Sequence, residues 1–357
     1  MVSFRAPGRV NLIGEHTDYS DGFCLPVAID RECRITSTPA AAARICATSS
    51  QLDGTVELDL AGRPVGDLPR WGGFVAGAVT TLTAAGHRVD GADLIVDSSV
   101  PAGAGLSSSS ALSVALILAL LPPGAPVRAD PRELARLALA AEIATTGLPS
   151  GIMDQLASLG GRAGHALLLD CRTLTVEPVA LPPDLAILVV HSGLPRELAD
   201  SEYAQRAHAC AAAAARLGLR ALRDATLDQV RDDPVARHVV SENARVLACC
   251  DAMRSGDLEQ VGRLLLAGHA SLRDDFRVST PELDLLVDAF LQAGALGARL
   301  TGAGFGGCVV GLTTRDRADA CLAATVETYR TTSGQIPTGF RVEAVAGAGE
   351  ITEEGQG

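Results

Sequence analysis

The stretch Val100-Pro101-Ala102-Gly103-Ala104-Gly105-Leu106-Ser107-Ser108-Ser109-Ser110-Ala111 stands between a strand-like run at 93–98 and an apolar helical run at Ser107–Leu121. Its glycines allow a tight turn with converging backbone N–H groups, and the helix behind it adds the positive end of its dipole. The serine hydroxyls supply further donors or a ligand for Mg²⁺. The pattern predicts an anion cradle, with a flexible Gly/Ser connector and an ordinary serine N-cap as the alternative.

Around this stretch, the N-terminal half carries short β-branched or alternating runs broken by Gly, Pro and Asp, which predict a sheet. These runs are residues 2–6, 9–13, 24–29, 33–38, 43–48, 55–59 and 93–98. Helical patterns occupy Trp71–Ala85 and Pro131–Thr145. Asp130 as N-cap and Pro131 at the first helical position mark the start of the second helix.

The dipeptide Pro182-Pro183 is a stiff break, and a chain of 357 residues is long enough for two domains. We therefore expect domains at 1–180 and 181–357. Beyond the break, the pattern predicts mostly helix from Pro195 to Gln292 and a frayed tail at 347–357. The remaining predicted elements are strands at Ala166–Leu169, Ala186–Val190, Ala298–Thr301, Cys308–Leu312 and Phe340–Val345, and a helix at Arg317–Thr331. This order indicates an α+β fold.

All 30 basic residues are arginines, because the sequence contains no lysine. This excludes a P-loop with its Walker A lysine, a protein kinase with its strand lysine, and a pyridoxal enzyme with its Schiff base. A nucleotide site in this chain must therefore use backbone N–H groups or arginines.

The formal net charge of −12 opposes binding to a phosphate backbone or an anionic membrane, so neither nucleic acid nor membrane is an expected partner. Nine cysteines lack a CxxC pair, and several lie in apolar runs, which is typical of free thiols in a reducing compartment. The N-terminus carries no long apolar segment of the signal-peptide type. We expect a cytoplasmic protein.

The segment Ala6–Tyr19 has an unusual density of polar side chains for an apolar strand context. Glu15, His16 and Asp18 crowd three hydrogen-bonding side chains into four positions around a turn, an arrangement that suits the neighbouring hydroxyls of a sugar. A metal site ranks lower, because no second cluster supplies further ligands at a recognisable spacing. A surface turn remains the structural alternative.

Two further segments carry candidate function. Thr301–Cys308 has four glycines between two predicted strands, which suits close backbone approach to a ligand, although a structural turn explains the glycines nearly as well. Gly151-Ile152-Met153-Asp154-Gln155 stands at a helix start, where Asp154 can be a catalytic group or only a partner of the helix dipole.

Together these segments resemble the galactokinase family, within the small-molecule kinases that include homoserine and mevalonate kinases. Residues Gly8–Tyr19, continuing to Gly22 and Leu25-Pro26, resemble the family's sugar signature. Residues Pro101–Ala111 resemble its nucleotide signature. Residues Thr301–Cys308 resemble the family's third motif. The three motifs follow one another along this chain in the order that the family has. Gly151–Gln155 and Ser279–Asp284 are also similar to family segments.

The resemblance implies a two-domain GHMP-kinase-like fold, with an N-terminal mixed sheet, a C-terminal split β-α-β (ferredoxin-like) domain, and the active site in the cleft between them. It implies ATP-dependent phosphorylation of the anomeric C1 hydroxyl of galactose, with Mg²⁺ as cofactor, by a monomer or weak homodimer.

Carried over residue by residue, the resemblance assigns two catalytic residues, Asp154 as the base at the anomeric hydroxyl and Arg9 as the cation between that oxygen and the γ-phosphate. The sugar contacts it assigns are Glu15, His16, Asp18, Gly151 and Tyr203. The ATP contacts are Trp71, at the adenine pocket, and Gly103, Gly105, Leu106, Ser107, Ser108, Ser109 and Ser110. The Mg²⁺ ligands are Ser109 and Glu142. These roles suit phosphoryl transfer, which asks mainly for positioning and charge stabilisation.

The chain departs from the family at His191-Ser192-Gly193, where many members carry Asn or Asp before Ser/Thr, and after Tyr203, where an Asn often follows. These departures bear on the C4 to C6 side of the sugar. The nearest alternative is the same C1 chemistry on galacturonate, N-acetylgalactosamine, arabinose, or a cyclitol or secondary-metabolite intermediate. A non-catalytic sugar and ATP sensor is an alternative from another class, and a structural protein is a third.

Overall fold

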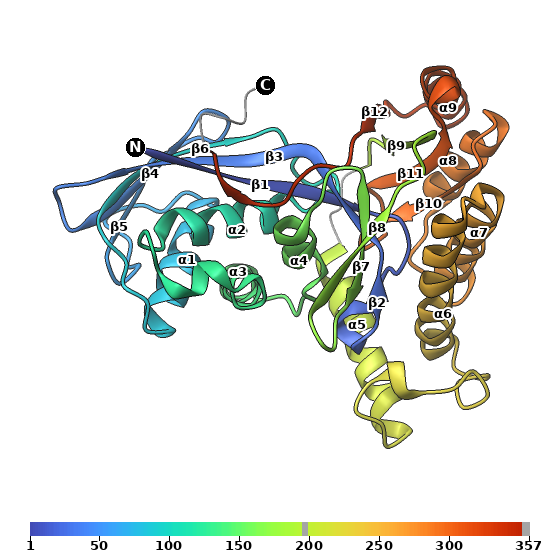
Figure 1. The fold of residues 1–357 in the computed structure, drawn as a ribbon, viewed down its shortest axis with the longest axis horizontal. Coiled ribbons are helices and arrows are strands. Elements are labelled where there is room, and N and C mark those ends of the chain that lie inside the picture. The colour runs from blue at the N-terminus through green and yellow to red at the C-terminus, as the bar shows by residue number, and fades with distance from the viewer. Residues whose placement is uncertain (195–198, 352–357) are drawn as a thin grey trace.

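The computed structural model describes residues 1–194 and 199–351. Six strands form the first sheet, in the order β13-β1-β3-β6-β4-β5 (Figure 1). They are β1 Val2–Asn11, β3 Pro26–Pro39, β4 Arg44–Ser49, β5 Val56–Asp59, β6 Ala92–Ser98 and β13 Gly349–Glu350. The pair β4–β6 is parallel and the other pairs are antiparallel, which confirms the predicted mixed sheet.

Four helices cover one face of this sheet, as Figure 1 shows. They are α1 Gly72–Ala84, α2 Ser108–Leu120, α3 Pro131–Thr146 and α4 Met153–Gly160. Helix α2 is buried on all sides from Ser110 to Leu120, because it packs against the sheet and against the other three helices. The predicted cap is confirmed, since the Asp130 side chain accepts from the backbone N–H groups of Arg132 and Glu133.

A three-stranded sheet follows in the order β2-β7-β8, with β2 Phe23–Cys24, β7 His165–Asp170 and β8 Thr175–Ala180. The sequence did not predict β8, because Pro178 lies inside it. Proline removes a backbone donor and is tolerated in an edge strand, and β8 pairs with β7 alone.

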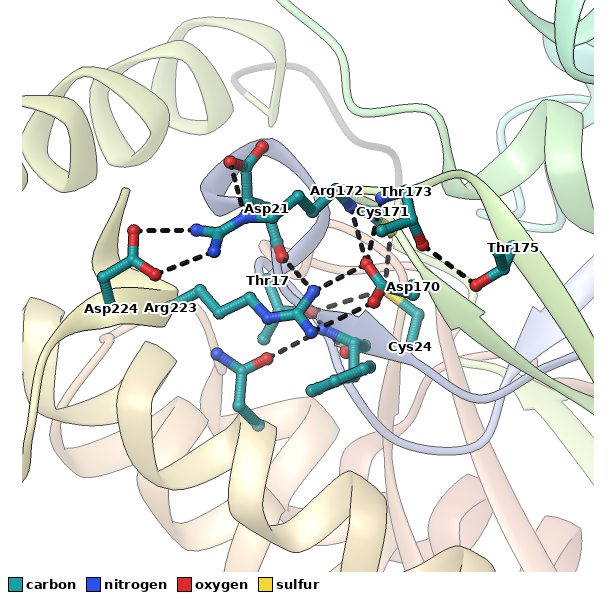
Figure 2. Close-up of polar contacts among 12 residues, drawn as sticks. Thr17, Asp21, Cys24, Asp170, Cys171, Arg172, Thr173, Thr175, Arg223 and Asp224 are labelled. Atoms are coloured by element: carbon teal, nitrogen blue, oxygen red, sulfur yellow. Dashed lines mark hydrogen bonds and ion pairs between the residues drawn. The ribbon is translucent and has the colours of Figure 1, made fainter. Parts of the chain in front are cut away.

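Arginine side chains fasten this sheet to the turn at 17–22 and to the short 3₁₀ helix Leu222–Asp224, as Figure 2 shows. Arg223 donates to both Asp170 oxygens, at 2.6 and 3.0 Å, and to the Asp21 carbonyl at 3.0 Å. Arg172 joins Asp21 to Asp224 in the same layer. Charge-assisted bonds from Arg172 and Arg223 to Asp21 therefore fix the segment that carries the predicted sugar-binding residues.

The C-terminal sheet has the order β10-β11-β9-β12, and all of its pairs are antiparallel. Its strands are β9 Leu185–His191, β10 Gly297–Thr301, β11 Cys308–Thr314 and β12 Thr338–Val342. Helices α5 Ala199–Arg216, α6 Pro234–Ser255, α7 Leu258–Asp274 and α8 Pro281–Gln292 connect β9 to β10, and α9 Ala318–Ser333 connects β11 to β12. This is the predicted split β-α-β arrangement.

The predicted fraying of the tail was wrong for residues 347–351. Strand β13 pairs with β1, and Gly347 and Ala348 donate to the carbonyls of Gly161 and Ser158. A Cβ on Gly347 would overlap the Leu159 carbonyl, so this close approach requires glycine. Residues 352–357 lie outside the described part. Strand β13 therefore completes the first sheet. The predicted domain division at 180/181, between β8 and β9, stays a prediction.

The largest hydrophobic cluster joins the two large sheets. It contains Val27 and Ile35 of β3 together with Val189 of β9, Val310 of β11 and Val342 of β12. Every helix in the described part of the chain is too short or too polar to cross a lipid bilayer.

Candidate active site

A cavity of about 450 Å³ brings the predicted segments together, and its volume suits a small-molecule ligand. All of the predicted site residues except Trp71 and Leu106 line it. The C-terminal half contributes Tyr203, Gly302 and Ala303 to the wall. Residues far apart in the sequence thus converge on one space.

Arg9 and Asp154 form a two-bonded ion pair at this cavity. Arg9 Nε and Nη2 donate to the two Asp154 oxygens at 2.8 and 3.0 Å, and Arg9 Nη1 donates to the Gly105 carbonyl at 2.6 Å. Ser107 Oγ also donates to Asp154, at 2.6 Å. The Asp154 side chain is 23% exposed and that of Arg9 only 6%, so the carboxylate presents the more accessible surface.

Local geometry explains how Arg9 reaches this position. The register between β1 and β3 shifts between Pro7 and Arg9, and the Arg9 backbone N–H donates to the Leu106 carbonyl instead. A Cβ on Gly8 would lie 2.6 Å from that carbonyl, so glycine is needed there. The buried Leu106 therefore acts through its backbone, by joining the first motif to the second.

The glycine and serine stretch turns into α2 through residues in the left-handed region. Gly103 and Gly105 have φ of 71° and 79°, and Ser107, the residue before the helix, has φ of 62°. This backbone brings the N-terminal end of α2 to the cavity, where Ser107, Ser108, Ser109 and Ser110 line the wall. Unpaired N–H groups at such an end favour an anion.

Glu142 of α3 stands beside these serines. Its Oε1 accepts from Ser109 Oγ at 2.5 Å, and its Oε2 accepts from Ser110 Oγ at 2.8 Å and from Gln155 Nε2 at 2.7 Å. Burial raises the pKa of Glu142, and these hydrogen bonds oppose the shift.

The described residues contain no group of three His, Cys, Asp or Glu side chains that could hold a metal by themselves. One carboxylate and one hydroxyl nevertheless fit Mg²⁺, which prefers oxygen ligands and usually completes its shell with water and substrate phosphates. Ser109 and Glu142 meet this requirement.

Asp18 and Gly151 lie in contact at the cavity. A Cβ on residue 151 would overlap Asp18 Oδ2, so glycine makes room for that carboxylate. Burial, together with the nearby charge of Asp154, raises the pKa of Asp18 to about 6. Tyr203 of α5 packs edge-on against Tyr19, and burial raises the pKa of its hydroxyl.

His16 uses both of its ring nitrogens inside the protein. Nε2 lies 3.1 Å from the Ala303 carbonyl and Nδ1 lies 2.9 Å from the Tyr19 hydroxyl. A carbonyl only accepts, so this arrangement assigns the proton to Nε2. Burial lowers the pKa of His16 to about 3, so the ring is neutral at physiological pH. The ring joins the sugar signature to the third motif, and its predicted contact with a sugar stays a prediction.

Trp71 lies away from the cavity wall. Its indole N–H donates to the Asp53 carbonyl at 3.0 Å and its ring belongs to the large hydrophobic cluster. Its neighbour Arg70 is exposed and lines the cavity instead. Sequence reasoning missed Arg70, although an arginine beside the tryptophan was a usable signal in a chain that has no lysine.

The departure at His191-Ser192-Gly193 does not line the cavity. The Ser192 N–H donates to the Gly307 carbonyl, and a Cβ on Gly193 would lie 2.8 Å from the Ile336 carbonyl. Ser192, together with the pairing of His191 with Cys308, therefore supports the third motif, whereas Gly193 packs against the segment that precedes β12. The part of this loop at 195–198 lies outside the described residues.

Fold and site together define a small-molecule kinase of the GHMP class. Residues 73–162 match the family model described as the GHMP kinases N terminal domain, and residues 250–331 match GHMP kinases C terminal. A crystal structure of mevalonate kinase shares the fold, with a TM-score of 0.66 at 18% identity, over 97% of this chain and 100% of that chain.

Within this class, the chain belongs to the galactokinase family. Residues 2–39 match the galactokinase galactose-binding signature. The chain is 43% identical to the galactokinase of Roseiflexus sp. (strain RS-1), over 99% of this chain and 93% of the relative. It is also 43% identical to that of Mycobacterium bovis (strain BCG / Pasteur 1173P2), over 98% and 99%.

Lactococcus lactis galactokinase complexed with galactose has a similar structure. The TM-score is 0.90 at 33% identity, over 98% of this chain and 95% of that chain. The resemblance read from the motifs is thus confirmed.

Proposed function

We propose that this chain is an ATP-dependent sugar kinase that phosphorylates the C1 hydroxyl of galactose, giving galactose 1-phosphate and ADP. The observation that carries the proposal is the Arg9–Asp154 pair, which faces a cavity bounded by an anion cradle on one side and by hydroxyl-binding side chains on another. The 43% identity to galactokinases supports galactose as the acceptor.

Asp154 orients the anomeric hydroxyl and accepts its proton as the oxygen attacks the γ-phosphorus. Arg9 holds the carboxylate through two bonds, so the accepting oxygen has a fixed direction before substrate arrives. The guanidinium also adds positive charge close to the transferring group.

The γ-phosphoryl group passes through a loose transition state, so the protein contributes mainly position and charge. Backbone N–H groups of the glycine and serine stretch and the N-terminal end of α2 bind phosphate oxygens, and Arg70 lies at the same cavity. Ser109 and Glu142 would hold Mg²⁺, which neutralises phosphate charge when bound. An adenine contact by Trp71 stays a prediction.

Glu15, Asp18, the Gly151 backbone and Tyr203 bind the sugar hydroxyls that do not react. The net charge of −12 favours small molecules over nucleic acid or membrane as partners. Eight of the nine cysteines are buried, which suits a protein of a reducing cytoplasm. The protein acts as a monomer or weak homodimer.

A coupled ADP-release assay with Mg-ATP and separate sugars tests the function. We expect turnover with galactose well above that with galacturonate, N-acetylgalactosamine, arabinose and glucose. Turnover with another of these sugars would keep the chemistry and replace the substrate. Sugar binding without turnover on any of them would favour a sensor instead.

A further inference from the structure

Two carboxylates and two guanidiniums form a buried cluster at the wall of the cavity. Arg299 Nη2 of β10 contacts Glu15 Oε2 at 2.5 Å and Glu242 Oε1 at 2.7 Å. Arg245 contacts the other oxygen of Glu242, at 2.7 Å. The side chains of Glu15, Glu242 and Arg299 are at most 1% exposed. When Glu15 is ionised, two negative charges balance two positive ones, as burial of ionic groups requires.

Glu242 is the fixed member of this cluster. It accepts from the Gly14 backbone N–H at 2.9 Å and from Arg245, so hydrogen bonds hold it from several sides. Its two cationic partners, Arg299 and Arg245, hold its pKa well below its usual range, against the effect of burial. Arg299 is thereby anchored to α6 through Nη2, the same nitrogen that contacts Glu15.

Glu15 has fewer hydrogen bonds than Glu242, and Arg299 and the nearby Asn11 side chain oppose the rise that burial causes in its pKa. Arg299 contacts its Oε2, whereas its Oε1 is buried and has no hydrogen-bond partner among the described residues. Glu15 lines the cavity. A buried carboxylate oxygen without a donor is costly, and a ligand hydroxyl is a group that removes this cost on binding.

The packing around Arg299 shows that its position is built into the fold. Gly268 of α7 faces the guanidinium, and a Cβ there would overlap Arg299 Nη1. Glycine inside a helix is less favourable than alanine, so its presence in α7 gives Arg299 space at the expense of helix stability.

We propose that Arg299 is a positioning residue for sugar binding, which holds Glu15 so that Oε1 is presented to a hydroxyl of the substrate. The inference rests on the proposed function. Arg299 does not itself line the cavity and acts through Glu15, while Glu242 holds the Arg299 Nη2 group that contacts Glu15. Arg299 of β10 and Glu15 of the sugar signature thus form one specificity element, although they lie 284 residues apart in sequence.

A double-mutant cycle in the full chain tests this, with Arg299→Lys, Glu15→Gln and the double variant. Lysine keeps the charge but replaces the planar fork by a single ammonium group. We expect Arg299→Lys to raise KM for galactose about tenfold or more while KM for ATP changes less than about twofold. In the Glu15→Gln background, Arg299→Lys should change KM for galactose by less than about threefold, because the carboxylate that Arg299 positions is already absent.

Two further variants separate positioning from stability. Arg245→Gln removes a cation from Glu242 without touching Glu15, so it should lower the melting temperature and leave KM for galactose within about twofold of wild type. Gly268→Ala keeps every charge and displaces the guanidinium, so it should raise KM for galactose in the same direction as Arg299→Lys. It also serves as the test if Arg299→Lys does not fold.

Additive effects of Arg299→Lys and Glu15→Gln on KM for galactose would overturn the inference, as would equal increases in KM for both substrates. If wild type phosphorylates galactose and these variants behave additively, the inference fails and the proposed function stands. If wild type prefers another sugar, that sugar replaces galactose in the cycle. Absence of turnover with every sugar rejects both.

Discussion

At the scale of single residues, the contacts of Asp154 explain how its carboxylate is oriented and why its replacement should stop turnover. Two bonds from Arg9 and one from Ser107 Oγ set the direction of the carboxylate. The remaining exposed surface of Asp154 is what an acceptor hydroxyl can reach. Loss of the carboxylate therefore removes the proton acceptor and leaves the cradle for the phosphates in place.

We expect Asp154→Asn to lower kcat by about 100-fold or more, in the range typical of a lost general base. Affinity for ATP should stay within about threefold of wild type, since the amide keeps the size of the side chain. Steady-state kinetics and ATP titration by calorimetry measure the two effects. Retained turnover in the variant would remove Asp154 from the catalytic role.

Arg70 supplies a second prediction at this scale. It is exposed, lines the cavity, and stands in a chain whose phosphate contacts cannot come from lysine. Arg70→Met should raise KM for ATP about tenfold, because a charge-assisted bond to a phosphate contributes roughly 1.5–3 kcal/mol. KM for galactose should change little.

Arg88→Met is the matched control for Arg70, because Arg88 is an exposed arginine outside the cavity that pairs with Asp90. It should behave as wild type. Equal KM values for ATP in both variants would show that Arg70 does not contact the nucleotide.

At the scale of elements, the sequence predicted what periodicity and local chemistry determine. Capping residues predicted the helix that begins at Pro131 after Asp130. The glycine pattern predicted the turn that leads into α2. Strand β8 was missed because Pro178 argues against a strand unless its edge position is known. The partnership of Glu15 with Arg299 and Glu242 was unreadable, because only the tertiary fold brings these residues together.

Strand β13 lies in the tail that was wrongly predicted to fray. Its contribution to the stability of the fold can be measured. A chain ending at Ala346 loses the β13–β1 pairing and the bonds from Gly347 and Ala348. At about 1 kcal/mol for each bond, its melting temperature should fall by about 4 °C or more.

A chain ending at Ile351 is the control for this truncation, since it removes only residues 352–357. It should melt within about 1 °C of the full chain. Equal melting temperatures for both truncated chains would show that β13 contributes nothing to stability.

At the scale of the whole molecule, burial of titratable groups makes stability depend on pH. His238 is buried between Ser271 Oγ, at 2.9 Å from Nδ1, and the Glu15 carbonyl, at 3.2 Å from Nε2. Burial lowers its pKa from 6.5 to about 4. Its contribution to stability is therefore fully present above pH 6.5 and is lost as pH falls through about 4, because only the unfolded chain binds the proton in that window.

Glu15 acts in the opposite direction, since burial raises its pKa from 4.5 to about 7 and its contribution is lost as pH rises through that range. A wild-type profile alone mixes these effects. Comparison with His238→Gln separates them, because the other groups are common to both proteins. The stability advantage of wild type over the variant should shrink by about 3 kcal/mol between pH 7 and pH 4.

For a chain of this size, the difference in melting temperature between wild type and His238→Gln should be about 4 °C smaller at pH 4 than at pH 7. Thermal melts at closely spaced pH values measure it. His208→Gln is the matched control, since His208 is exposed, and its curve should run parallel to wild type throughout. Parallel curves for His238→Gln and wild type would mean that His238 binds its proton equally well in the folded and unfolded chains, and that burial does not lower its pKa.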